Sequence, residues 1–421
     1  MNILFAPSHY MLDGISGSSE YGWAYHIVDT LSTYPNVKLF VLTGVVKGEE
    51  AFAPNVTVVR LDRSPTLNLT FSYRLAFIAR YYAAARQVLR HHRIDLIHHI
   101  LPFGHGTTFN PLPLLGQTGA IPLVIGPLQA PHTMPSAEER IYSQGDVRQY
   151  RGIGDFLQEK GGAMLLHRGG KIVNMLSAET LRRSDYLVAV NEQARQLYTA
   201  QAPHVPSTVI APGLPLERFE GIATRRQAGA VLEILYVGWL IQRKGVDLII
   251  DAIADLVVQF PLLRLRIVGD GPQRGALEDL VERRGLDRHV IFEGVVPGTK
   301  VGEYYARADV FVSMSYSESF GQSLVEAMVM GLPVISAENV GSREIVQDGV
   351  TGYLVTPGVT GELVARLRLL LVDSHLRTMV GEQARQTARQ RYNWRTIGQQ
   401  YLNVYREAIQ RRQTRLLHVS S

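Results

Sequence analysis

Short apolar runs alternate with longer amphipathic segments along most of the chain. After the apolar run at residues 3–6, apolar side chains recur at helical spacing over residues 21–31. The same alternation starts again at residues 234–238, after a polar stretch at residues 220–229. Alternating strands and helices are typical of parallel sheets covered by helices. The pattern therefore predicts an α/β protein with two Rossmann-like, doubly wound domains that face each other across a cleft.

The predicted strands are short and apolar, and several of them end at or just before glycine or proline. We place them at residues 3–6, 37–42, 56–61, 94–98, 122–127, 186–190, 234–238, 264–269, 290–294, 310–316 and 334–335. Their carboxyl ends matter most, because ligands of open parallel sheets bind beyond the carboxyl ends of the strands.

Two features mark the division of the chain. The strand at residues 186–190 is expected to end the first half, and residues 207–215, which contain proline and glycine, to cross to the second. The polar residues 220–229 serve as a linker. We therefore predict a first domain over residues 1–210 and a second domain over residues 228–393.

One stretch, from Ser317 to Ser336, combines the strongest signals. Small polar residues form a loop, and an apolar helix then begins near Gln322 and stops before Gly331. Glu326 lies about one turn into that helix, and Glu318 lies in the loop before it. A helix N-terminus favours phosphate, while carboxylates accept hydrogen bonds from hydroxyls. Together they predict a nucleotide-sugar site; the alternative is that both glutamates merely cap or solvate the helix end.

A second candidate segment is Gly238–Gly245, which follows the first strand of the second half. A bound diphosphate needs cations to offset its negative charge, and Arg243 and Lys244 can supply them. Lys244 stands next to a glycine, which permits close approach of the backbone. The alternative is two solvated charges at the start of a helix.

The first half offers weaker candidates. His98, His99 and His105 are expected near a strand end, and His105, between two glycines, could contact an acceptor hydroxyl; the alternative is a loop histidine without a role. Residues from about 132 to 180 are expected to be helical and polar, with breaks at Gly161-Gly162 and Gly169-Gly170, and would suit an acceptor surface.

Residues 71–93 form a predicted basic amphipathic helix. Such a helix can lie on an anionic membrane, although more often its aromatic side is core and its arginines are solvated. No apolar run approaches the roughly 20 residues that a membrane-spanning helix requires. The start of the chain is predicted to be a strand and not a signal peptide, so a cytoplasmic protein is expected, with possible peripheral contact at the inner membrane face.

Composition narrows the classes of function. The 421 residues are 46% hydrophobic and 19% charged, which is typical of a globular protein of two or three domains. The absence of cysteine excludes disulfides, cysteine-ligated zinc and a thiol nucleophile. A net charge of +5 without a dense basic stripe suits an anionic small ligand and argues against nucleic acid.

The sequence around the two glutamates resembles a known family. Glu318 and Glu326, with seven residues between them, lie within Glu-Ser-Phe-Gly, Glu-Ala-Met and Gly-Leu-Pro-Val. This is similar to the motif of the retaining glycosyltransferases of family 4, which have the GT-B fold. The resemblance implies that Glu318 lies by the donor sugar, that Glu326 accepts hydrogen bonds from the ribose, and that loop amides hold the sugar and phosphates. The implied amide residues are Ser319, Phe320, Gly321, Gln322, Ser323 and Leu324.

The resemblance also extends to other positions. It implies that Lys244 binds the diphosphate, with Gly238 at the same strand end, and that Gly17 belongs to a loop near the donor phosphates. Trp239 stands where the family usually has arginine, so Arg243 is a candidate substitute. Two further implied residues of the base and ribose pocket are Asp270 and Val296. The closing helix, from residue 394, would cross back to the first domain.

By this resemblance we expect a retaining enzyme that moves a hexose from a nucleoside diphosphate sugar to a hydroxyl of a glycan, glycolipid or small molecule. The expected mechanism is attack on the face that the leaving group departs from, with no metal and no separate cofactor. One alternative is a nucleotide-sugar-binding protein without transfer activity, for which Trp239 is a hint. Another is an NAD-type dehydrogenase, against which the missing Gly-x-Gly-x-x-Gly pattern argues. The base, the sugar, the acceptor and the oligomeric state are left open.

Overall fold

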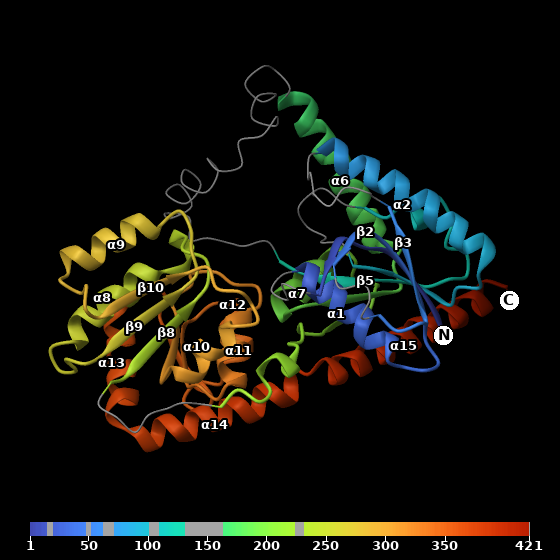
Figure 1. The fold of residues 1–421 in the computed structure, drawn as a ribbon. Helices are drawn as coiled ribbons and strands as arrows, with labels where there is room; N and C mark the ends of the chain where they lie inside the picture. The colour runs from blue at the N-terminus through green and yellow to red at the C-terminus, as the bar shows by residue number, and fades with distance from the viewer. Residues whose placement is uncertain are drawn as a thin grey trace. The chain divides into compact units, whose positions relative to one another are not determined.

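The computed structural model describes most of the chain, namely residues 1–14, 20–47, 52–61, 71–100, 109–130, 163–223 and 231–420. The described residues form two compact units (Figure 1). Unit 1 contains those between residues 1 and 213 together with the closing helix from Trp394, and unit 2 those between Leu214 and Asn393. Each unit is described by itself below.

The described residues of unit 1 form a parallel seven-stranded sheet with the strand order β3-β2-β1-β4-β5-β6-β7. Its strands are β1 (Asn2–Asp13), β2 (Lys38–Lys47), β3 (Val56–Arg60), β4 (Leu96–His99), β5 (Leu123–Leu128), β6 (Tyr186–Ala189) and β7 (Ser207–Val209). This order is that of a doubly wound sheet with one strand added at the edge.

Helices cover this sheet, and the last of them comes from the far end of the chain. They are α1 (Glu20–Ser32), α2 (Phe71–His91), α3 (Pro111–Leu114), α6 (Ala163–Arg182), α7 (Glu192–Gln201) and α15 (Trp394–Ser420). α15 packs against α1 and β5, as the expectation of a closing helix on the first half requires. The buried face of α2 holds Phe77, Ile78 and Tyr81, so this part of its apolar side is core.

Three predictions about unit 1 were wrong in detail. β1 continues to Asp13, well past residue 6, because it pairs with β2 over residues 2–5 and, after a register shift, again between His9 and Asp13. The strand at residues 186–190 is not the last of the first half, since β7 pairs with β6 beyond it. Gly169-Gly170 does not break the chain's helical path but lies inside α6, because glycine lowers helix stability without forbidding a helix.

The described residues of unit 2 form a parallel six-stranded sheet with the order β10-β9-β8-β11-β12-β13. Its strands are β8 (Glu233–Val237), β9 (Arg264–Val268), β10 (Val290–Gly294), β11 (Val310–Ser313), β12 (Val334–Ala337) and β13 (Gly352–Val355). Its helices are α8 (Val246–Leu256), α9 (Arg274–Arg283), α10 (Val301–Arg307), α11 (Gln322–Val329), α12 (Val340–Ile345), α13 (Thr360–Val372) and α14 (Ser374–Arg391), with short 3-10 turns η3 (Leu216–Phe219) and η4 (Gln242–Lys244).

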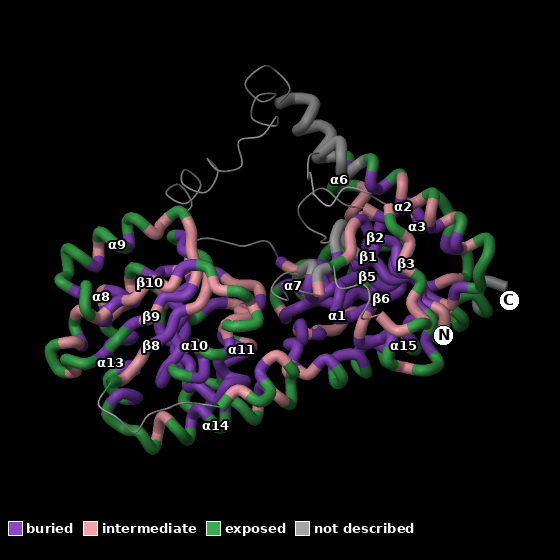
Figure 2. The backbone as a smooth tube through the Cα atoms, viewed as in Figure 1, coloured by how far each residue is buried: buried purple, intermediate pink, exposed green. Residues whose placement is uncertain are grey.

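The core of unit 2 lies between the sheet and the helices α8, α9 and α13, while α10 and α11 lie on the opposite face of the sheet (Figure 1). Strand residues such as Ile234, Leu265 and Val312 are fully buried in this core, and so are Ile249 and Ile253 of α8. Figure 2 shows the buried residues gathered along the strands of each unit and the exposed ones along the outer helices. Strands buried on both faces explain their continuous apolar runs.

The order of this sheet reverses between β8 and β11, which lie side by side although more than 70 residues separate them. Ligands of open parallel sheets bind at such a reversal, because the loops after the two strands turn to opposite sides and leave a crevice. No helix among the described residues is both long and apolar enough to cross a membrane.

Candidate functional site

The loops that follow β8 and β11 meet at the carboxyl end of the sheet in unit 2. The amide of Tyr316 donates a hydrogen bond to the carbonyl oxygen of Arg243 at 3.0 Å, and the side chain of Arg243 donates to the carbonyl oxygen of Ser317. These bonds bring together the two segments that the sequence marked as candidates. They lie at the reversal of strand order.

Glu318 is the centre of this contact. Its carboxylate accepts hydrogen bonds from Lys244 Nζ and, at 3.0 Å, from Ser315 Oγ, and Arg243 Nη1 lies 3.5 Å from the same Oε1. The side chain of Glu318 is 15% exposed and that of Lys244 20% exposed. Burial pushes the pKa of Glu318 upward, but the charges of Lys244 and Arg243 outweigh burial and hold that pKa below its usual value. Glu318 is therefore a carboxylate at neutral pH.

Glycine makes this close packing of loops possible. Gly245 has φ +61°, and a Cβ there would lie 2.4 Å from the carbonyl oxygen of Met314 at the end of β11. The residue after Lys244 therefore has to be glycine for the β8 loop to pass the β11 loop. Gly238, at the end of β8, lies equally close to the next strand, since a Cβ at Gly269 would meet its carbonyl oxygen at 1.9 Å.

The loop after β12 supports Glu318 from a third strand. Asn339 Nδ2 donates a hydrogen bond to the carbonyl oxygen of Ser315 at 2.8 Å. The amide of Gly341 donates to the carbonyl oxygen of Glu318 itself at 2.9 Å. Asn339 also caps α12 in a capping box with Ser342, so its position is fixed by the helix that it begins.

Glu326 is the fifth of the eight residues of α11 and is buried, with 8% of its surface exposed. Tyr305 of α10 donates a hydrogen bond from its hydroxyl to Glu326 Oε2 at 2.8 Å, and Gln322 Nε2 donates to Oε1 at 3.3 Å. Burial raises the pKa of Glu326, and the Tyr305 hydrogen bond and the charge of Arg218 partly offset this rise. A carboxylate buried in an apolar helix needs a hydrogen-bond partner, and Tyr305 is that partner in the structure.

α11 begins as predicted at Gln322, after Gly321 with φ +74°. No side chain of the described residues makes a capping hydrogen bond at this terminus, which leaves it suited to a negatively charged group. Phe320 just before it is buried, and its ring packs edge-on against Tyr392 at 5.6 Å. Leu324 is buried as well, whereas the side chains of Ser319 and Ser323 are only half-buried.

The remaining predicted site residues make no hydrogen bond or ion pair with Glu318 or Glu326, or lie outside the described residues, although the carbonyl oxygen of Asp270 accepts a hydrogen bond from the amide of Leu240 in the β8 loop at 3.0 Å. Asp270, after β9, accepts a hydrogen bond from the amide of Gly271 and pairs with Arg274 at 3.3 Å. Val296 is half-buried, and Trp239 is 62% exposed at the end of β8. Gly17 and His105 lie outside the residues that the structure describes.

Two further histidines of the first half, His98 and His99, are fully buried in unit 1. His98 lies between the hydroxyl of Tyr405 at 2.7 Å from Nδ1 and the carbonyl oxygen of Gly126 at 3.0 Å from Nε2. Burial lowers the pKa of His98 to about 3, so its ring is neutral. The side chain of His98 is therefore a core group that joins α15 to the sheet.

Sequence reasoning missed four supporting residues: Ser315, Tyr305, Asn339 and Arg218. Ser315 and Asn339 directly follow strands β11 and β12, which is a usable signal. Tyr305 lies 21 residues before Glu326, and no local spacing connects the two. Within the described part of the chain, no group of three or more His, Asp or Glu residues is placed to hold a metal ion.

Residues 225–387 match the family model described as glycosyl transferases group 1. The chain carries a glycosyl transferases group 1 domain. It covers β8 to most of α14 and hence Lys244, Glu318 and Glu326, together with Ser315, Tyr305 and Asn339, whereas Arg218 lies before it. The resemblance of the motif to the group 1 glycosyl transferases is confirmed.

Relatives of this glycosyltransferase domain carry related names. The chain is 35% identical to sulfoquinovosyl transferase of Arabidopsis thaliana over 38% of this chain and 31% of that protein. It is 29% identical to D-inositol 3-phosphate glycosyltransferase of Streptomyces bingchenggensis over 87% of this chain and 79% of that protein. The matched region covers only 31% of the length of the Arabidopsis protein and 45% of the length of each of two further relatives.

A solved structure supports the fold of the whole chain around this glycosyltransferase domain. The structure of HepE from Anabaena in complex with UDP has a TM-score of 0.65, with 22% sequence identity, over 96% of this chain and 99% of that one. The chain therefore shares the α/β fold with two parallel-sheet domains that was predicted, the fold of the GT-B glycosyltransferases.

Proposed function

We propose that this protein is a retaining glycosyltransferase that transfers a hexose from a nucleoside diphosphate sugar to an acceptor hydroxyl. The observation that carries the proposal is the cluster of Glu318, Lys244 and Arg243 next to the uncapped N-terminus of α11. Relatives named as transferases of several sugars, and a similar fold solved with UDP, support the donor class.

In the chain without a donor, the carboxylate of Glu318 neutralises the same cations that would bind the diphosphate. On donor binding, the diphosphate would take Lys244 and Arg243 as its counterions, and the carboxylate of Glu318 would turn to the hydroxyls of the sugar. Charge that develops on the leaving diphosphate would be stabilised by these cations and by the positive end of α11. Acceptor attack from the leaving-group face would keep the configuration of the anomeric carbon.

In this proposal Arg243 does the work of the arginine that the family pattern expects at the position of Trp239. The position of Arg243 supports this proposal, because Arg243 and Lys244 both lie against one carboxylate oxygen of Glu318. Trp239, in contrast, is an exposed residue. Amides between Ser319 and Leu324 would hold the phosphates, and Asp270, Val296 and Gly238 would line the nucleoside side. Gly17 and His105 remain candidates from the sequence for phosphate and acceptor contact.

We further propose that the protein works without a metal or separate cofactor, in the cytoplasm. Peripheral membrane contact through residues 71–93 remains a proposal in which the exposed arginines would act, because Phe77, Tyr81 and Val88 are buried in unit 1.

A binding and turnover experiment tests the function. UDP-, GDP- and ADP-sugars and NAD are screened by thermal shift, because a ligand at about 100 times its Kd adds about 2.7 kcal/mol of stability. Transfer or hydrolysis is then followed with the donor that binds, and the anomeric configuration of the product is read by NMR. Binding without turnover would indicate a nucleotide-sugar-binding protein, and inversion would exclude the retaining mechanism.

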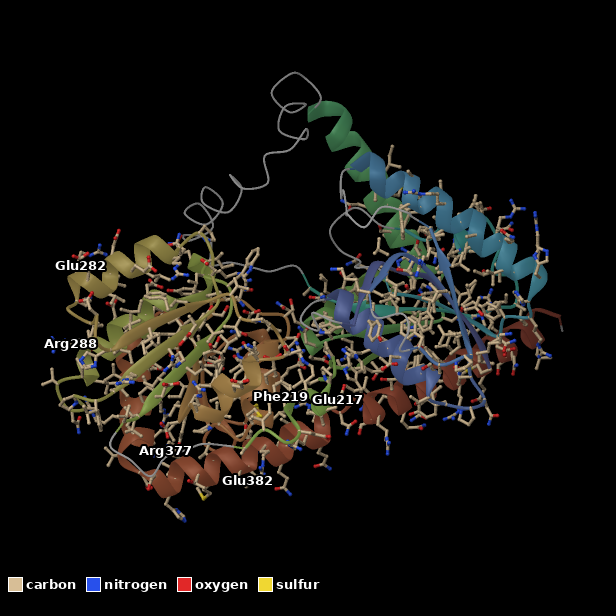
Figure 3. All side chains as sticks on the ribbon, viewed as in Figure 1. Glu217, Phe219, Glu282, Arg288, Arg377 and Glu382 are labelled. Atoms are coloured by element: carbon tan, nitrogen blue, oxygen red, sulfur yellow. The ribbon has the colours of Figure 1, made fainter. Side chains whose placement is uncertain are left out.

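Glu318→Gln isolates the role of the carboxylate, with Glu282→Gln as the matched control on the exposed face of α9, where Figure 3 labels Glu282. We expect transfer to fall at least about 100-fold in the first variant, a loss of about 2.7 kcal/mol of transition-state stabilisation, and to stay unchanged in the second. Near wild-type transfer by Glu318→Gln would contradict the role proposed for Glu318.

A further inference from the structure

The segment that begins unit 2 packs directly behind Glu326. Phe219 of η3 is 3% exposed, and its ring meets that of Tyr305 edge-on at 6.5 Å. Figure 3 labels Phe219 and Glu217 on this segment; of these two residues Glu217 is exposed and Phe219 is buried. Gly302 of α10 makes the approach possible, since a Cβ there would lie 2.4 Å from Ile222 Cδ1. The start of unit 2 is therefore fixed to the helix that carries Tyr305.

Arg218, next to Phe219, brings a positive charge into this contact. Its Nη2 donates a hydrogen bond to the carbonyl oxygen of Gly298 at 2.7 Å. Its Nη1 is buried and has no hydrogen-bond partner among the described residues. The charge of Arg218 acts on both Tyr305 and Glu326, and it lowers the pKa of each. A guanidinium with a buried, unused donor beside a buried carboxylate serves that carboxylate electrostatically.

Glu326 needs such help because only its ionised form accepts hydrogen bonds at both oxygens. Burial favours the protonated form of Glu326. Tyr305 occupies Oε2 with a bond of 2.8 Å, whereas the bond from Gln322 to Oε1 is long, at 3.3 Å. Oε1 is therefore the oxygen of Glu326 with the weaker hydrogen bond in this structure.

We propose that Tyr305 and Arg218 are positioning residues for the donor: Tyr305 fixes the orientation of Glu326, and Arg218 keeps it ionised, so that Oε1 accepts hydrogen bonds from the ribose hydroxyls of a nucleoside diphosphate. The inference rests on the proposed function. It adds Arg218, from the segment that begins unit 2, to the donor site, and this residue lies outside the family-like motif between Glu318 and Ser336.

The test uses the full chain with UDP, GDP and ADP as probes in titration calorimetry between pH 5.5 and 8. The variants are Arg218→Gln, Arg218→Lys and Tyr305→Phe, with Arg288→Gln as a surface control that removes one exposed charge from unit 2. We expect Arg218→Gln and Tyr305→Phe to weaken binding of the preferred nucleotide about tenfold at pH 7. The loss should grow as the pH falls, because Glu326 then becomes protonated, and Arg218→Lys should restore most of the affinity.

A second measurement does not depend on nucleotide. Urea midpoints are compared for Arg218→Gln, Glu326→Gln and the double variant, because a direct interaction makes the two shifts non-additive. We expect Arg218→Gln to lower the midpoint less when Glu326 is already Gln. Additive shifts together with wild-type affinity and pH dependence would overturn the inference and leave the proposed function standing. A wild-type chain that binds none of the three nucleotides would overturn the proposed function and the donor role of both residues.

Discussion

At the scale of single residues, the ion pair of Lys244 with Glu318 stabilises the candidate donor site in the absence of ligand. Lys244→Met removes the closest cation from a carboxylate that is 15% exposed. We expect the free energy of unfolding to fall by about 3 kcal/mol, because a largely buried charge loses its main partner. Urea unfolding at pH 7.5 measures the change.

The double variant Lys244→Met, Glu318→Gln is the matched control for that prediction. It removes both charges, so it should recover most of the lost stability while nucleotide-sugar binding stays weak. The pKa of Glu318 lies below its usual value, so its stabilising effect is present at neutral pH and is lost as the pH falls through the folded-state pKa. Equal stability of the single and double variants would show that the unpaired charge of Glu318 does not cause the loss.

The buried His98 leads to a prediction about how the stability of the chain changes at acidic pH. Its pKa is about 3 in the folded chain, against an ordinary value of 6.5, so the unfolded chain takes up the proton first. Between these two values the free energy of unfolding should therefore fall as the pH falls, by up to about 1.4 kcal/mol per pH unit from this residue. His98→Gln, which keeps one donor and one acceptor, should be less stable at pH 7.5 but flatter between pH 6.5 and 5. A parallel slope in wild type and variant would contradict this account.

What could be predicted at this scale depended on sequence distance. Glu318, Glu326 and Lys244 stand in local patterns of glycine, strand and helix, so their places at the sheet edge followed from the sequence. The pairing of Lys244 with Glu318 did not, because 74 residues separate them and only the neighbouring strands β8 and β11 bring them together. Tyr305 and Arg218 were missed for the same reason, and the buried place of His98 depends on α15.

At the scale of elements, the β8 loop can pass β11 only with glycine at position 245. Gly245→Ala would place a Cβ 2.4 Å from a backbone oxygen at φ +61°, and we expect a loss of about 1 to 3 kcal/mol of stability together with weaker donor binding. Gly275→Ala in α9 is the control, because nothing lies within 4 Å of its Cβ position. The control should be neutral or up to about 1 kcal/mol more stable in urea unfolding, since alanine favours a helix.

Elements with a strong period or a sharp stop were predicted closely. α11, between the loop at Gly321 and the stop at Gly331, starts where the sequence placed it. The errors came where tertiary pairing extended or added a strand, as in β1 and β7, which no periodicity signals. Glycine in α6 misled for a related reason, since its cost of about 1 kcal/mol is small enough for packing to override.

At the scale of the whole molecule, the two units do not follow each other in chain order. Unit 1 needs α15, which follows all of unit 2 in sequence. α15 buries a continuous row of side chains in unit 1, namely Trp394, Ile397, Tyr401, Leu402, Val404, Tyr405 and Ala408. Its later turns are fixed by ion pairs of Arg412 and Arg415 with Asp185, which is 2% exposed. Each large side chain contributes about 1.5 to 3 kcal/mol when buried.

The sum of these contributions, about 10 kcal/mol, is comparable with the total stability of a typical domain. Residues 1–213 expressed alone should therefore fail to fold, while residues 214–393 should fold alone with a cooperative urea transition. Adding residues 394–421 as a separate peptide should restore structure to residues 1–213, followed by circular dichroism and by quenching of the Trp394 fluorescence on docking. The peptide with Tyr405→Ala and Arg412→Ala is the control and should not dock, because it lacks the partners of His98 and Asp185. A cooperative transition of residues 1–213 without the peptide would show that α15 is an accessory of unit 1 and not part of its core.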